Sequence, residues 1–166
     1  MQRGPGNKMS KGNAVRIFTD GACSGNPGIG GWAAIICTDT EVKTLSGGCD
    51  DTTNNRMELL AVVNGLTHVL VKGHREVLVA SDSAYVVNAI NNRWVHKWNT
   101  NGWIKTDGEP VKNTDLWQSL LELIESFDKV EFMKVKGHSG HHLNETADKC
   151  ARNEVQRLKK LKETDV

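Results

Sequence analysis

The order of strand-like and helix-like segments is the feature that most constrains the fold of this chain. Three segments with the β-branched and aromatic composition of strands come first, and helical segments then alternate with two further short strands. Because strands separated by helices tend to pair in parallel, this βββαβαβα order predicts an α/β protein with a mixed five-stranded sheet flanked by helices. The predicted strands are Val15 to Thr19, Gly31 to Cys37, Val42 to Ser46, Val77 to Ala80 and Val130 to Val135.

The predicted helices follow from apolar residues that recur every three or four positions. The clearest pattern runs from Leu116 to Phe127, where five large apolar side chains share one side of a helix. The other predicted helices are Asn55 to Val71, Ser83 to Ile90 and Asn144 to about Lys162. A length of 166 residues is that of one ordinary domain, so we expect a single domain over residues 14–163 after a flexible leader over residues 1–13.

Charge and hydropathy limit the partners of the chain. The 21 basic and 20 acidic residues give a net charge of +1, so any surface that binds nucleic acid must be local. The longest apolar runs, such as Leu66 to Val71, are too short to cross a bilayer, and we expect no membrane partner. The absence of a secretory signal and of any C-x-x-C pair predicts a cytoplasmic protein with free thiols. Without a long exposed apolar strip, a monomer is expected.

Four acidic residues are predicted at the ends of strands or near the starts of helices. They are Asp20, Glu58, Asp82 and Asp148, and such positions let side chains from distant parts of the chain meet at one edge of a sheet. Each also has a local explanation: a turn at Asp20, a capping box ending at Glu58, a helix cap at Asp82 and a helix-dipole role for Asp148. If the four carboxylates meet, they offer hard oxygen ligands suited to Mg²⁺, with Mn²⁺ as a substitute.

The sequence around each acid is more specific than the acid alone. The four motifs are TDGACSGNPG at residues 19–28, TTNNRMEL at 52–59, SDSAYV at 81–86, and VKGHSGH at 135–141 just before Asp148. In this order, and on these predicted elements, they closely resemble the type 1 ribonucleases H of bacteria. The resemblance extends from about Val15 to Ala151 and implies the ribonuclease H-like fold, which matches the sheet and helices predicted above.

The resemblance also implies an activity and an active site. It implies an endonuclease that hydrolyses the RNA strand of RNA/DNA hybrids by a two-metal-ion mechanism and leaves 3′-hydroxyl and 5′-phosphate ends. Asp20, Glu58, Asp82 and Asp148 carry over as metal ligands, and His138 carries over as the mobile histidine of a glycine-containing loop. A histidine titrates near neutral pH and suits proton transfer or product release. A zinc site built on His138 and its neighbouring histidines lacks the spacing of known structural sites.

Recognition of RNA requires contacts to the 2′-hydroxyl in a shallow minor groove. By resemblance, Asn26, Asn54 and Asn55 contact the RNA strand and minor groove, Thr53 contributes to a phosphate pocket for the DNA strand, and Tyr85 and Trp94 line the DNA-strand channel. The same polar residues are also compatible with turn and cap roles.

Residues 91–113 correspond by resemblance to the protruding handle of bacterial members. The chain has Asn99-Thr100-Asn101 where a basic run is usual, so we expect weaker or more salt-sensitive hybrid binding. Two alternatives remain: a module that binds hybrids without cutting them, and another nuclease on the same fold. The first would be expected to lack one of the four acids, and the second to lack the handle or the Asn54-Asn55 pair.

Overall fold

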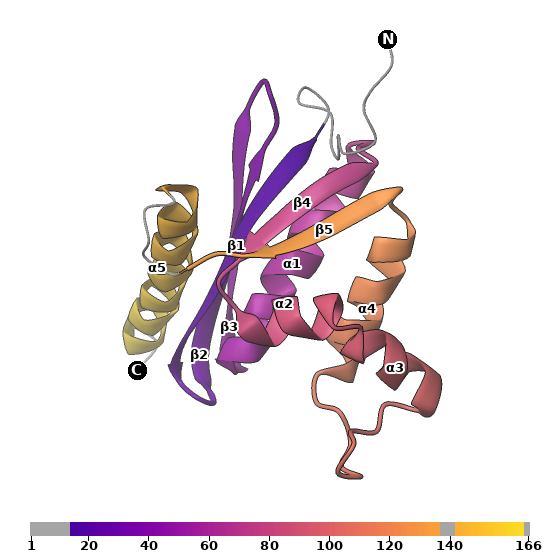
Figure 1. Cartoon of the computed structure of the whole chain (residues 1–166). Helices are drawn as coiled ribbons and strands as arrows, with labels where there is room; N and C mark the ends of the chain where they lie inside the picture. Colours follow the sequence, from indigo (N-terminus) through magenta and orange to yellow (C-terminus); the bar gives the residue numbers. More distant parts are fainter. Residues whose placement is uncertain (1–13, 137–141, 165–166) are drawn as a thin grey trace.

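The computed structural model describes residues 14–136 and 142–164, and within them a mixed five-stranded sheet is flanked by helices (Figure 1). The strand order is β3-β2-β1-β4-β5, with antiparallel pairing from β1 to β3 and parallel pairing of β4 with both β1 and β5. The predicted fold class is therefore confirmed. The strands are β1 Val15–Gly25, β2 Gly28–Cys37, β3 Val42–Thr52, β4 Glu76–Ser81 and β5 Lys129–Lys134.

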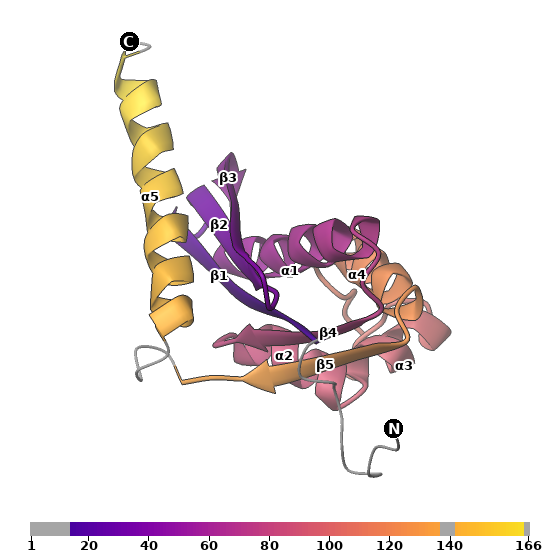
Figure 2. The same ribbon diagram turned by 90° about the horizontal axis from the view of Figure 1, so that it is seen from above.

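The helices cover the two faces of the sheet unequally. Helices α1 to α4 lie on one side and α5 lies on the other, as the view from above shows (Figure 2). Alternate residues of β1 serve the two layers: Ile17 belongs to the core under α1, and Phe18 belongs to the core under α5. The helices are α1 Asn54–Val71, α2 Ala84–Asn91, α3 Trp94–Asn101, α4 Thr114–Glu125 and α5 His142–Thr164.

Several of the predicted strands were too short, and one helix was not predicted. The first strand continues through Asp20 to Gly25, because β1 and β2 form a long antiparallel ribbon that extends beyond the parallel part of the sheet. The handle contains a helix, α3, that was not predicted. It starts after Arg93 and ends at Gly102, both in the left-handed backbone region, and its short length gives little periodic signal.

Three further predictions concern the cysteines, membrane-spanning helices and the leader. The four cysteines are free. In residues 14–136 and 142–164, no helix is both long enough and apolar enough to span a bilayer. The leader predicted for residues 1–13 lies outside the described residues.

Candidate active site

Strands β1 and β4 bring two of the predicted acids together. Their parallel pairing extends to Thr19 and Ser81; Asp20 is the next residue of β1, and Asp82 directly follows the end of β4. Beyond this point β1 continues beside β2, whereas the chain after β4 turns into α2. The two carboxylates therefore lie where the two strands separate, at the carboxyl ends of parallel strands, which is a common place for sites in α/β proteins.

Helix α1 contributes the third acid from above the sheet. Glu58 lies one turn into α1, is only 5% exposed and faces β1. Asp20 is 6% exposed, and Asp82 is the more exposed of the three. Each residue offers a carboxylate oxygen, and these oxygens all lie within 4.8 Å of one another. Sequence-distant residues thus form one compact acidic cluster.

The close approach of α1 to β1 depends on Gly21. A Cβ atom built at this position would lie 2.6 Å from the backbone nitrogen of Glu58 and 2.7 Å from the carbonyl carbon of Met57. Both are backbone atoms, which cannot rotate away as a flexible side chain would. A larger residue at position 21 would force the strand and the helix that carry Asp20 and Glu58 apart.

We therefore expect Gly21→Ala to destabilise the protein by about 1–3 kcal/mol, as overpacking does, and to abolish most of the activity. The measurements are denaturant unfolding and hydrolysis of a nucleic-acid substrate. Gly73→Ala is the control, because Gly73 has a φ of +93° but no atom within 4 Å of an added Cβ. It should lose some stability through backbone strain and keep its activity. Full activity of Gly21→Ala would contradict this account of the site.

The cluster is electrostatically strained in the absence of a cation. Burial, repulsion from Asp82 and interaction with Asp148 raise the pKa of Asp20 to about 8. Burial and the charges of Asp20 and Asp82 raise the pKa of Glu58 well above its usual range. Glu58 Oε1 is also buried without a hydrogen-bond partner among the described residues. A divalent cation fits this set, since it would neutralise the repulsion and give the orphaned oxygen a partner.

The fourth predicted acid comes from the opposite face of the sheet. Asp148 lies in α5, close enough to Asp20 to raise its pKa through a hydrogen bond and charge repulsion. Its own carboxylate forms an ion pair with Arg152 at 2.9 Å, one turn further along the helix. Asp148 therefore borders the cluster without belonging to the group of three. His138 lies outside the described residues.

The local explanations for the acids do not hold in the structure. Asp20 is inside a strand and not in a turn. Thr53 caps α1 and Ser83 caps α2, each accepting a hydrogen bond from a backbone N–H at 3.2 Å, so neither Glu58 nor Asp82 is needed for capping. Asp148 lies in the second turn of α5. Local roles therefore do not explain the positions of the four acids, which favours a role that the acids share at one site.

The predicted substrate-contacting residues lie in the β1–β2 turn, at the start of α1, and on α2 and α3. The Asn26 side chain accepts a hydrogen bond from the backbone N–H of Asn54 at 3.2 Å, which ties the β1–β2 turn to the start of α1. Asn26, Asn54 and Asn55 are exposed, and Trp94 on α3 is 46% exposed. Thr53 serves as a helix cap, as its alternative role required. Tyr85 is half-buried on α2.

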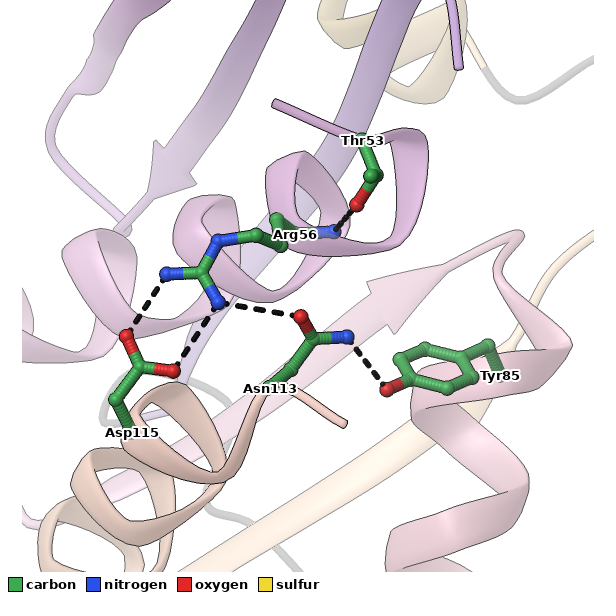
Figure 3. Close-up of polar contacts among 5 residues, drawn as sticks. All are labelled: Thr53, Arg56, Tyr85, Asn113 and Asp115. Carbon is green, nitrogen blue, oxygen red and sulfur yellow. Dashed lines mark hydrogen bonds and ion pairs between the residues drawn. The ribbon is translucent and has the colours of Figure 1, made fainter. Parts of the chain in front are cut away.

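A polar network beside these residues was not predicted from the sequence. Arg56 joins the start of α1 to Asn113 and Asp115 at the start of α4, and Asn113 continues to Tyr85 (Figure 3). The only available signal was that Arg56 belongs to the motif that contains Glu58. Its partners are 57 and 59 residues away in sequence, and no pattern in one chain connects them.

The carboxylate oxygens gathered at this edge of the sheet are suited to a hydrolase that uses a divalent metal ion. The sequence profile of the RNase H family matches residues 12–156, and the chain belongs to this family. It is 50% identical over 148 residues to the ribonuclease H of Rhizobium johnstonii, covering 89% of this chain and 95% of the relative. It is 48% identical over 146 residues to the ribonuclease H of Acetivibrio thermocellus, covering 88% of this chain and 97% of that relative.

A solved structure supports the same assignment. LC9-RNase H1, described as a type 1 RNase H with the type 2 active-site motif, superposes with a TM-score of 0.75 at 29% sequence identity. The match covers 90% of this chain and 75% of that one. The resemblance stated from the sequence motifs is thereby confirmed for both family and fold.

Proposed function

We propose that this enzyme is an endonuclease that cuts the RNA strand of RNA/DNA hybrids by a two-metal-ion mechanism and leaves 3′-hydroxyl and 5′-phosphate ends. The observation that carries the proposal is the buried cluster of Asp20, Glu58 and Asp82, whose oxygens lie within 4.8 Å of one another. Family membership supports the substrate class. Mg²⁺ is the proposed cofactor, with Mn²⁺ as a substitute, because the described cluster offers only carboxylate oxygens.

The four carboxylates are proposed to hold the metal, with Asp148 completing the group of three from α5. When bound, the metal supplies charge stabilisation at the scissile phosphate and lowers the pKa of the attacking water. The chain itself holds its carboxylates in place before substrate arrives, because Asp20 and Glu58 are fixed by the packing of α1 on β1. His138 is proposed to assist proton transfer or product release.

The residues around the cluster are proposed to select the hybrid. The exposed amides of Asn26, Asn54 and Asn55 are suited to the 2′-hydroxyl groups and base edges of an RNA strand in a shallow minor groove. Thr53 is proposed to contact a phosphate of the DNA strand, and Tyr85 and Trp94 to line the path of that strand. The exposed face of Trp94 is compatible with a sugar or base contact.

One assay tests this function. Labelled RNA/DNA hybrid, double-stranded RNA and double-stranded DNA are each incubated with the enzyme in Mg²⁺, Mn²⁺ or chelator. We expect internal cuts in the RNA strand of the hybrid only, with both metals and not with chelator. Hybrids that remain whole in Mg²⁺ would refute the proposal, and tight binding without cleavage would establish the non-cleaving module instead.

The handle leads to a prediction about salt. Asn99 and Thr100 are exposed on α3, and Lys105 forms an ion pair with Asp107 at 3.8 Å. Because fewer phosphate contacts release fewer counterions, the lack of a basic run favours weaker binding with a shallower salt dependence, and not the more salt-sensitive binding also considered above. We expect Asn99→Lys/Thr100→Lys to steepen the dependence of log affinity on log salt by about one for each added phosphate contact. Asn101 is left unchanged because its side chain bonds Ile104 in the turn after α3. An unchanged slope in a fluorescence-anisotropy titration would contradict the prediction.

We further propose that residues 14–163 act as one domain after a leader at residues 1–13, and that the enzyme is a cytoplasmic monomer. Sedimentation of the purified chain tests the oligomeric state. A concentration-dependent dimer would contradict it.

A further inference from the structure

Arg56 connects two helix starts that border the proposed hybrid-binding surface. Its guanidinium forms a two-pronged ion pair with Asp115, at 2.8 Å from Nη2 and 3.1 Å from Nη1. The same Nη1 also donates to Asn113 Oδ1 at 3.1 Å (Figure 3). One planar group therefore binds a carboxylate and an amide together, a geometry that arginine can provide and lysine cannot.

Asn113 transmits this arrangement to α2. Because its Oδ1 accepts from Arg56, its Nδ2 is directed to the Tyr85 hydroxyl and donates to it at 2.9 Å. Trp117 Nε1 donates to the same hydroxyl at 3.2 Å, and the Tyr85 and Trp117 rings lie 5.4 Å apart. Both acceptor positions of the hydroxyl are thus used, which fixes the Tyr85 side chain between Asn113 and Trp117.

The backbone of Asn113 indicates that this bridge has a function beyond helix capping. Asn113 occupies the N-cap position of α4, where an asparagine side chain normally accepts a hydrogen bond from the helix. Here it makes no such bond, and its φ of +63° lies in the left-handed region. A strained residue that gives up its capping role for a bridge is typical of a functional position.

The network also includes a residue proposed to contact the DNA strand. Thr53 Oγ1 accepts a hydrogen bond from the backbone N–H of Arg56 at 3.2 Å. The backbone of Arg56 is therefore bonded to Thr53. Its side chain is bonded to Asn113, which in turn is bonded to Tyr85. Three elements, the starts of α1 and α4 and the helix α2, are held in one arrangement by the linked side chains of Arg56 and Asn113.

We propose that Arg56 is a positioning residue for hybrid binding, which acts through Asn113 to hold Tyr85 at a fixed place relative to Thr53. This inference rests on the proposed function, because Thr53 and Tyr85 are assigned there to the DNA strand. It predicts that loss of the Arg56 fork weakens binding and leaves the chemical step intact, since the acidic cluster is formed by other side chains.

The test is Arg56→Lys, which keeps the positive charge beside Asp115 but loses the fork to Asn113. We expect KM for the hybrid to rise about tenfold, the effect of one charge-assisted hydrogen bond, with kcat nearly unchanged. Arg75→Lys is the matched control, because Arg75 also forms an arginine–aspartate pair between separate segments, with Asp128 at 3.4 Å. It should leave KM unchanged, whatever it does to stability.

A second variant tests the same inference in case Arg56→Lys does not fold. Asn113→Gly removes the bridge but suits the left-handed backbone, so it should fold and raise KM as Arg56→Lys does. The double variant should be no worse than Asn113→Gly alone, because the two residues act in series. An unchanged KM in Arg56→Lys, an equal fall in kcat, or additive effects in the double variant would overturn the inference. A wild-type enzyme that neither binds nor cuts hybrids would overturn the proposed function as well.

Discussion

Replacing Asp20 with asparagine should reduce hybrid cleavage by a factor of about 10³ or more, the largest effect expected of any single substitution here. Asp20 is the most central acid of the site. One of its carboxylate oxygens lies within 4.8 Å of carboxylate oxygens of Glu58 and Asp82, and its pKa is also raised by Asp148. Asparagine has nearly the same shape but no charge, so the site keeps its form and loses its hold on the cation. Cleavage rates at saturating Mg²⁺ measure the effect.

Two further measurements separate this loss from misfolding. Hybrid affinity of Asp20→Asn should remain close to that of the wild type, because the proposed strand contacts lie on other residues. Asp39→Asn is the matched control, since Asp39 is exposed in the turn between β2 and β3. It should cleave at the wild-type rate. Substantial cleavage by Asp20→Asn would remove Asp20 from the proposed metal site.

The metal-free enzyme should become less stable as the pH rises from about 4 to about 8. The pKa of Asp20 is about 8 in the folded protein, against an ordinary value of 3.8, so between these values the folded state holds a proton that the unfolded state has released. Unfolding free energy then falls by about 1.4 kcal/mol per pH unit for this group, a loss on the order of 5 kcal/mol in total. Denaturant unfolding in chelator across this range measures the effect.

Comparison with the pH profile of Asp20→Asn separates the effect of Asp20 on stability, including its effect on Glu58, from that of the histidines. Burial lowers the pKa of His68 and His96, and these groups act in the opposite direction, adding stability as the pH rises through their ordinary range. Both remain in the variant, so the difference between the two profiles reports Asp20 together with its effect on the pKa of Glu58. Added Mg²⁺ should restore wild-type stability at pH 8 and have a much smaller effect on the variant. Parallel profiles for the two proteins would contradict this prediction.

Much of the fold could be predicted because the core follows simple periodicities. The pattern from Leu116 to Phe127 became α4, and the predicted helix from Asn55 to Val71 differs from α1 by one residue. The end of β1 was wrong because Asp20-Gly21 has the composition of a turn. Pairing with β2 keeps this segment extended, and that pairing is a long-range interaction without a local signal.

The candidate site, like the fold, has one part that could be predicted from the sequence and one part that could not. The meeting of Asp20, Glu58 and Asp82 could be predicted because each lies in a specific motif, and their oxygens come together where β1, β4 and α1 converge. The bridge from Arg56 through Asn113 could not be predicted, since it depends on how the start of α1 faces the start of α4. That arrangement is set by the packing of α1 against α4 on one face of the sheet and not by either segment alone.

The attachment of the fourth acid to α5 has a consequence for how the site can vary. Asp20, Glu58 and Asp82 belong to a framework shared by three tightly packed elements, whereas Asp148 belongs to the helix on the other side of the sheet. Small residues such as Ala147 and Ala151 seat this helix against β1 and β2. We therefore expect substitutions under α5 to shift the carboxylate of Asp148 while the other three keep their spacing, and so to change the affinity of the proposed metal site without disturbing its centre.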